Sequence, residues 1–291
     1  MENRAMRNRR LMMLLLTLFI SGAIVIIYII SYAQKHEEIK QEVVLESLLP
    51  IDTSKVSGWR VIHEEDSTKN VTVVRSSSGW KVALPSGKSV EASPDLIRRS
   101  LLHMALMKPN SLETNKKEKW EELGVHEKGA RLIVFEGGRE SAAIYLGEMF
   151  FLNDVKANHY VRLPQDNNVY TVDLYLDGSL RAPLEKYRKK ELMNCEKPII
   201  SFAALSKPVV NNTAALNARK AICDLKPGAF VSRPDTEPLG NWKIIFNDSS
   251  FVSVLIWADD STYILGSTFN QGNYLSFKNE SFPEALSDLL R

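Results

Sequence analysis

The strongest constraint on this chain is an uninterrupted apolar run near its N-terminus. Residues 11–33 read LMMLLLTLFISGAIVIIYIISYA and include no charged side chain. At about 1.5 Å of rise per residue, a helix of this length reaches roughly 35 Å, which is enough to cross a hydrocarbon core of about 30 Å. The run therefore predicts a transmembrane anchor that begins at Leu11 and ends at Ala33.

The charges on either side of the run predict its orientation. Four arginines lie within residues 1–10, whereas lysines and glutamates are mixed in residues 34–40. Because basic flanks stay on the cytoplasmic side, we expect a single-pass inner (cytoplasmic) membrane protein with a cytoplasmic N-terminus and a periplasmic or extracellular C-terminal bulk. A small-x-small sequence at 31–33 also suits signal-peptide cleavage, but secretory apolar regions span only about 7 to 15 residues, which favours an uncleaved anchor.

The charge balance beyond the run argues against nucleic acid as a partner. Four of the 37 basic and one of the 35 acidic residues precede the run, so the rest of the chain carries 33 basic and 34 acidic residues. A nucleic-acid-binding surface needs an excess of basic side chains to displace counterions from phosphates. The expected partners are the lipid bilayer, through the N-terminal helix, and membrane or envelope proteins.

Both cysteines lie on the predicted extracytoplasmic side. Cys195 and Cys223 would be exposed there to an oxidising compartment, which favours a disulfide between them. Two unrelated buried thiols remain the alternative, because sequence does not show the Cα separation. No Cys-x-x-Cys occurs and the five histidines are scattered without ligand spacing, so we predict no metal site and no cofactor.

Short strands alternate with turns after the anchor. Apolar alternation and turn signals predict strands at residues 59–62, 71–75, 80–84, 131–135, 141–146, 158–162, 169–172, 252–257, 262–265 and 274–278. Helical spacing predicts helices at 94–107, capped by Ser93, and at 283–290. We therefore expect an α+β fold of antiparallel strands with helices packed on one face.

The predicted strands divide the chain into parts. We expect a cytoplasmic N-terminus (1–10), the anchor (11–33), a stalk (34–54), a first α+β domain (55–195) and a second, smaller α+β unit (196–291). The second unit repeats the order of elements in the first, with Gly266 and Tyr274 in the places of Gly147 and Tyr160. This order predicts two related hairpin-plus-strand units stacked on each other.

A series of turn glycines and packing aromatics carries a family resemblance. The series comprises WKVALP at 80–85, the helix at 96–106, WEELGV at 120–125, GARLIV at 129–134, YLG at 145–147, HYVR at 159–162 and VYTV at 169–172. It resembles the bacterial family known as domain of unknown function 4340, over about residues 55–195. The resemblance implies a membrane-anchored envelope protein, often encoded beside gliding-motility-type ABC transporter components, and it implies no reaction. Structural roles are expected for Trp80, Pro85, Trp120, Gly124, Gly147, Tyr160, Gly266 and Tyr274.

Motifs for known chemistry are missing. The chain has no Gly-x-Ser-x-Gly, and the Gly-Lys-Ser at 87–89 lacks the first glycine of a phosphate-binding loop. The acidic cluster at 64–66 fits a solvated loop better than a glycosidase or calcium site. The basic run at 186–190 could meet anionic lipid or a partner, but a solvated helix face is favoured. The five tryptophans fit core packing better than a sugar platform.

These observations favour a non-enzymatic protein. We expect a membrane-anchored extracytoplasmic scaffold or binding module of the bacterial envelope, accessory to a transporter or secretion complex. Two alternatives remain: an envelope hydrolase or transferase whose site joins residues distant in sequence, and a sensor with a small ligand between the two units. We assign no catalytic residue.

Overall fold

The computed structural model describes residues 26–27, 47–152, 156–204, 207–208, 212–226, 228–259, 261–287 and 290. Among these residues, no helix combines the length and the apolar character that crossing a membrane requires. The anchor predicted at 11–33 lies outside the described residues, apart from Ile26 and Ile27, and so does the predicted N-terminal segment 1–10. Of the predicted stalk, only residues 47–54 are described, and Leu48 and Leu49 are buried in the first core.

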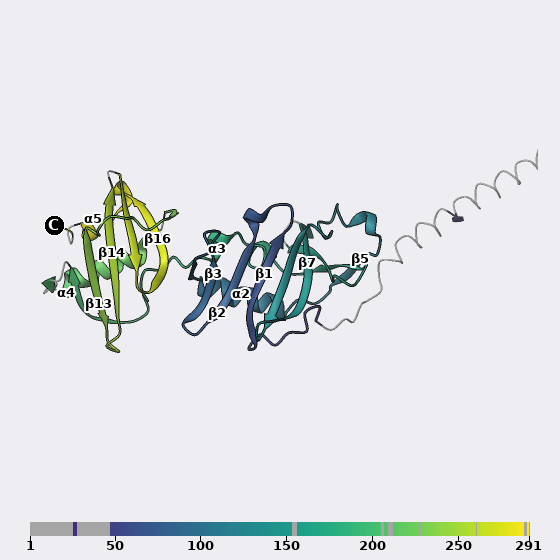
Figure 1. Ribbon diagram of the computed structural model, residues 1–291, viewed down its shortest axis with the longest axis horizontal. Helices are drawn as coiled ribbons and strands as arrows, with labels where there is room; N and C mark the ends of the chain where they lie inside the picture. The colour runs from purple at the N-terminus through teal and green to yellow at the C-terminus, as the bar shows by residue number, and fades with distance from the viewer. Residues whose placement is uncertain are drawn as a thin grey trace, which may run out of the picture.

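The described residues form two antiparallel sheets, which lie one after the other along the long axis in Figure 1. In spatial order, the first sheet has β4 (Ser89–Glu91), β3 (Gly79–Ala83), β2 (Val71–Ser76), β1 (Val56–His63), β6 (Ala130–Glu136), β7 (Arg139–Leu152), β8 (Lys156–Arg162), β9 (Val169–Val172) and β5 (Ser111–Thr114). The second sheet has β11 (Lys207–Pro208), β10 (Ile199–Ala204), β13 (Gly240–Phe246), β14 (Phe251–Asp259), β15 (Thr262–Ser267), β16 (Asn270–Lys278) and β12 (Phe230–Val231).

Helices are few and mostly short in the described part of the chain. The α-helices are α2 (Pro94–Ala105), α3 (Leu184–Tyr187), α4 (Asn212–Asp224) and α5 (Glu284–Ser287). The 3-10 turns are η1 (Ser67–Lys69), η2 (Lys117–Lys119), η3 (Leu176–Gly178) and η4 (Asn279–Ser281). The α+β prediction is therefore wrong: the molecule is a mostly antiparallel β protein with two sheets, and no layer of helices covers one face of repeated units.

The error in fold class has a physical origin. Several strands extend beyond the apolar residues from which they were predicted. Strand β7 continues past Gly147 to Leu152, and β16 begins at Asn270. The prediction also missed β4, β5, β10 and β13. Strand β13 carries a clear signal, since its buried and outward residues alternate along GNWKIIF. Leaving these segments out lowered the predicted share of strand, so the two predicted helices weighed more in the choice of fold class.

Local patterns in the first half do form the elements expected of them. In β2, Val71 and Val73 are buried while Thr72 and Val74 lie on the other face of the strand. Helix α2 starts with Pro94 after the cap residue Ser93, whose side chain makes no capping hydrogen bond. Its buried side includes Leu96, Ile97 and Met104, which join the core beneath the sheet. Trp59 is fully buried in that core.

The two sheets meet where the basic run 186–190 passes between them. Arg188 and Lys189 are each only 8 % exposed. Arg188 Nε donates to Asn273 Oδ1 at 2.9 Å, and Lys189 Nζ donates to the carbonyl oxygen of Phe269 at 2.9 Å. The predicted solvated helix face is therefore wrong at these two positions. The run is buried because β16, through Asn273, and the turn before it, through Phe269, supply acceptors from about 80 residues further along the chain.

Candidate functional site

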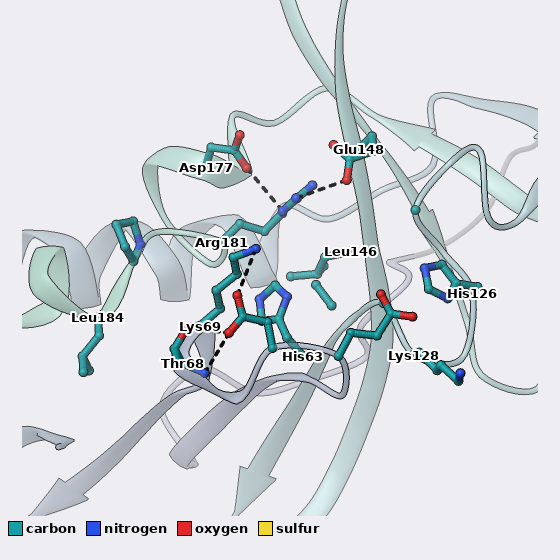
Figure 2. A pocket seen from close by; sticks show the side chains of 16 residues that line it. His63, Thr68, Lys69, His126, Lys128, Leu146, Glu148, Asp177, Arg181 and Leu184 are labelled. Carbon is teal, nitrogen blue, oxygen red and sulfur yellow. Dashed lines mark hydrogen bonds and ion pairs between the residues drawn. The ribbon is translucent and has the colours of Figure 1, made fainter. Parts of the chain in front are cut away.

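A polar cleft of about 590 Å³ opens on the first sheet. Its walls come from the end of β1 with η1, from the loop at 124–130, from β7 and from the segment at 177–184. Figure 2 shows the charged side chains converging on it. The lining residues are His63, Glu65, Asp66, Thr68, Lys69, Gly124, His126, Lys128, Gly129, Ala130, Leu146, Glu148, Asp177, Arg181, Pro183 and Leu184.

The η1 wall is held by local hydrogen bonds. Asp66 caps η1 by accepting from the backbone N–H and the hydroxyl of Thr68, and it pairs with Lys69 at 3.3 Å. These hydrogen bonds from Thr68 and Lys69 lower the pKa of Asp66. The backbone N–H of His63 donates to Asn70 Oδ1 at 2.7 Å, which closes the loop. The acidic cluster predicted as a solvated loop thus forms part of a cleft wall.

The β7 wall depends on a bulge at Gly147. The β7–β8 register shifts between Leu146 and Met149, and the N–H of Glu148 donates to the carbonyl oxygen of Leu123 at 2.9 Å. A Cβ at position 147 would collide with that carbonyl and would lie 2.6 Å from Cγ1 of Val125. Glycine is therefore required where the segment at 120–125 crosses the strand.

Arg181 fixes the opposite wall against β7. Its Nη1 donates to the carbonyl oxygen of Gly147, its Nε lies 3.3 Å from Asp177 Oδ1, and its Nη2 lies 3.6 Å from Glu148 Oε1. The Arg181 side chain is only 17 % exposed, so these contacts are partly desolvated. The guanidinium is thus engaged on each of its three nitrogens, and it positions Asp177 and Glu148 at the cleft.

Behind Arg181, a buried histidine supports Asp177. His159 Nδ1 donates to the carbonyl oxygen of Leu174 at 2.9 Å, and Nε2 lies 3.3 Å from Asp177 Oδ1. Burial lowers the pKa of His159, while Asp177 and Leu174 oppose that effect. A neutral imidazole donates to only one of these two acceptors.

Four lining side chains have no hydrogen-bond or ion-pair partner among the residues that the structure describes. They are His63, Glu65, His126 and Lys128. Burial, followed by the charges of Arg181 and Lys69, lowers the pKa of His63, and Asp66 opposes the shift weakly. These four side chains can therefore bond to a ligand without first breaking a hydrogen bond or an ion pair within the protein.

A serine–histidine pair lies outside the cleft lining. His103 Nδ1 and Ser179 Oγ are 2.6 Å apart, next to η3. Ser179 is fully buried, and its hydroxyl also contacts the carbonyl oxygen of Leu176. An incoming substrate would have to displace packed atoms to reach this hydroxyl. The pair fits a structural tie between α2 and η3 better than a nucleophile and its base.

The sequence-predicted positions serve packing and crosslinking. Cys195 and Cys223 form a disulfide with their Cα atoms 5.9 Å apart, as predicted. Trp120 is buried under Arg162, whose Cζ lies 3.6 Å from the centre of the tryptophan ring. Tyr160 stacks on Phe150 at 4.5 Å.

The remaining predicted positions lie at turns, close approaches and ring contacts. Gly124 has φ of +69° beside Glu148. Trp80 packs on Trp59, with the ring centres 5.3 Å apart, and Pro85 is exposed after β3. In the second sheet, Gly266 faces the ring of Tyr274. Of all these positions, only Gly124 lines the cleft.

Comparison with known proteins identifies one family. The model of the domain of unknown function DUF4340 matches residues 80–221. This segment is a DUF4340 domain. No curated protein and no solved structure matches the chain. The family read from the turn glycines and aromatics is therefore confirmed, although the match covers 80–221 and not the predicted 55–195. The DUF4340 assignment itself names no ligand or reaction.

The DUF4340 match divides the cleft. Gly124, Glu148 and Arg181 lie within the matched range, whereas His63 and Lys69 precede it. Sequence reasoning missed the cleft because its walls come together only through the pairing of β1 with β6 and of β6 with β7. The one available signal was the density of charged residues at 63–69, directly after an apolar strand.

Proposed function

We propose that this chain is a non-enzymatic, extracytoplasmic binding module of the bacterial envelope. The polar cleft carries the proposal, because its volume of about 590 Å³ falls within the range of ligand sites and it is lined by side chains of both charges. Its partner would be a component of a transport or secretion complex, to which the module is accessory. The transporter link rests on the family resemblance alone.

The bonding inside the cleft favours binding over proton-transfer chemistry. Arg181 is engaged by Gly147, Asp177 and Glu148, and Asp66 is engaged by Thr68 and Lys69. A general base must lie within hydrogen-bond reach of a proton that it removes. The ring of His63, by contrast, has neither a hydroxyl nor a carboxylate bound to it in the described structure. Fixed charges with a few open groups suit recognition.

Two features support placement outside the cytoplasm. The Cys195–Cys223 disulfide is the kind of bond that persists in oxidising compartments. The apolar run at 11–33 and the arginines before it remain the sequence basis for a membrane location with the bulk of the chain exported. We propose the periplasmic or extracellular side of the inner membrane for both sheets.

The cleft is also a better ligand site than the space between the two sheets. The predicted sensor would hold its ligand there, but Arg188 and Lys189 already fill that junction and bond to β16. A ligand entering at that point would have to displace buried cations from their acceptors. We therefore place recognition on the first sheet.

Site-specific photocrosslinking tests this function. A photoreactive amino acid would replace Lys128, which lines the cleft, and in a matched strain it would replace Ser78, which is exposed in the β2–β3 turn. After irradiation of intact cells, the full-length protein is purified and its adducts are identified by mass spectrometry. We expect a membrane transporter or secretion subunit, or a discrete small-molecule adduct, at position 128 and not at 78. The same adducts at both positions, or none at either, would contradict a binding role for the cleft.

A further inference from the structure

We propose that one end of the first sheet contacts the surface of the bilayer that holds the chain. The contact is separate from the cleft, and the inference rests on the proposed function, from which it takes the membrane placement. It is made by five exposed apolar side chains of the first sheet and its helix α2, which we name the apolar end: Leu102, Leu106, Phe151, Leu152 and Tyr175. Groups of exposed apolar side chains mark surfaces that meet a membrane or another protein.

The pairing of the strands brings three of these side chains to the same end of the sheet. Strand β7 reaches this end at Leu152, which pairs with Lys156 at the start of β8. Strand β9 ends at the same place, because Lys156 also forms an ion pair with Asp173, the residue that follows β9. Phe151 precedes Leu152 directly, and Tyr175 lies two residues after Asp173. These apolar side chains therefore border one end of the sheet.

Helix α2 brings the other two side chains to this end. Arg99 of α2 donates to the carbonyl oxygen of Gly178, and a Cβ on Gly178 would meet the ring of Tyr175 at 2.6 Å. Leu102 and Leu106 lie three and seven residues after Arg99, and positions with this spacing share one face of a helix. The face of α2 that packs beside Tyr175 therefore carries both leucines.

The chain from the N-terminus joins the described sheets at the same end. The N–H of Leu48 donates at 2.8 Å to the carbonyl oxygen of Met107, which directly follows Leu106. Residues 34–46 separate the predicted anchor from this point, and a chain of that length reaches at most about 45 Å when extended. A compact domain of the size of the first one is roughly 35 to 40 Å across. The connection is therefore about as long as the domain is wide, and the apolar end lies within reach of the bilayer.

The charged residues around the apolar end suit lipid headgroups. From residue 96 to residue 111, the Lys, Arg, Asp and Glu side chains are all basic and exposed: Arg98, Arg99 and Lys108. Such side chains bond to headgroup phosphates while their alkyl stems cover apolar surface. Asp173, an exposed carboxylate at this end, is paired with Lys156. Leucine and aromatic side chains with basic neighbours are typical of protein surfaces that lie in the membrane interface.

The second sheet offers closely matched controls. Phe251 is 57 % exposed, against 56 % for Phe151. Leu216 is 58 % exposed, against 51 % for Leu106. Both control residues lie beyond the junction at 188–189, in the part of the chain that is built around the second sheet. Replacing them removes the same kind of exposed side chain and leaves the apolar end intact.

The test places the full-length protein in nanodiscs of phosphatidylethanolamine and phosphatidylglycerol that include a lipid with a nitroxide on its headgroup. In separate samples, trifluoromethyl-phenylalanine replaces Phe151, Tyr175, Phe251 or Ser78, and fluorine NMR records its signal. Ser78 lies in the β2–β3 turn, at the end of the first sheet where β7 begins and opposite the apolar end. A nearby nitroxide broadens a fluorine signal. We therefore expect the signals at positions 151 and 175 to be lost and those at 251 and 78 to be kept.

Two double variants show whether the apolar side chains make the contact. With the fluorine label at position 175, Leu106→Ser combined with Phe151→Ser should restore the signal. Leu216→Ser combined with Phe251→Ser should leave it lost. Signals kept at both 151 and 175, an equal loss at 78, or the same effect of both double variants would overturn the inference. A protein partner or a second copy of the chain would then be the occupant of the apolar end.

The crosslinking at position 128 separates this inference from the proposed function. If the fluorine signals are kept but crosslinking captures a partner, the proposed function stands and only the bilayer contact is wrong. If the signals at 151 and 175 are lost while crosslinking captures nothing, the bilayer contact stands and the binding role of the cleft is lost. A full-length protein that does not enter nanodiscs would overturn the membrane placement and the contact together.

Discussion

Replacing Gly147 by alanine tests whether the cleft and the family-matched segment at 120–125 are mechanically linked. Position 147 lies where that segment crosses β7, and its carbonyl oxygen accepts a hydrogen bond from Arg181. A Cβ would clash with the carbonyl oxygen of Leu123 and would lie 2.9 Å from that of Tyr160. Both obstacles are backbone atoms, so neither can swing aside as a side chain would.

The expected cost follows from what has to move. Relieving the clash means shifting the 120–125 segment away from β7, which weakens the bond from the N–H of Glu148 to Leu123 and loosens Trp120 on Arg162. Overpacking of this kind costs about 1 to 3 kcal/mol, and the rigid neighbours place this site toward the upper end. For a domain of this size, we expect Tm to fall by roughly 5 to 10 °C.

Thermal unfolding followed by circular dichroism measures the loss, and amide hydrogen exchange measures its location. Exchange should accelerate at the N–H of Glu148, because its bond to Leu123 weakens when the segment at 120–125 moves. Gly87→Ala is the control: Gly87 has φ of +79° with no atom near its missing Cβ, so its cost of about 1 to 2 kcal/mol stays local. A Tm for Gly147→Ala within 2 °C of the wild type, with unchanged exchange at Glu148, would refute the reasoning.

Three further predictions concern other parts of the molecule. Cys223→Ser, or reduction of the disulfide, should destabilise the second sheet by about 3.5 kcal/mol from loop entropy, and an unchanged Tm under reductant would contradict this. Burial lowers the pKa of His63 and His103, so as the pH falls the unfolded chain binds protons before the folded chain does. The free energy of unfolding measured in urea should therefore be highest above pH 6.5 and should fall below it, and a profile that stays flat would contradict this. Asn273→Leu should loosen the junction, enlarging the radius of gyration by small-angle scattering while each sheet keeps its Tm; an unchanged radius would show that Asn273 is dispensable.

How far the sequence predicts the structure depends on how local each feature is. The strand at β2 and the helix α2 follow from the spacing of a few residues, since Val71 and Val73 or Leu96 and Ile97 already mark the buried side. The disulfide was also predictable, because only two cysteines exist to be joined. The fold class was not, because it depends on segments such as β13, whose alternating pattern was overlooked.

Features that join distant residues were beyond the reach of local patterns. The basic run looked like a solvated face because nothing near Arg188 or Lys189 supplies acceptors; Asn273 and Phe269 do so from 85 and 80 residues away. The cleft likewise unites His63 with Arg181 across the central strands of the first sheet. A charged cluster that follows an apolar strand indicates that a polar site can form there, but it does not identify the distant residues that complete the site.

Only part of the cleft lies within the family-matched range, so we expect related domains to differ in the part that lies outside it. The matched range supplies the support, because Gly147 leaves room for the segment at 120–125, Arg162 packs on Trp120 of that segment, and Arg181 ties β7 to the segment after η3. His63 and Lys69, which line another wall of the cleft, precede the matched range. The walls of the cleft thus come from two different stretches of the chain. Exchanging residues 63–70 for a neutral loop of equal length should therefore leave the exchange protection of the Glu148 N–H intact, because that N–H bonds to Leu123 within the matched range, and loss of the protection would show that the two parts are one unit.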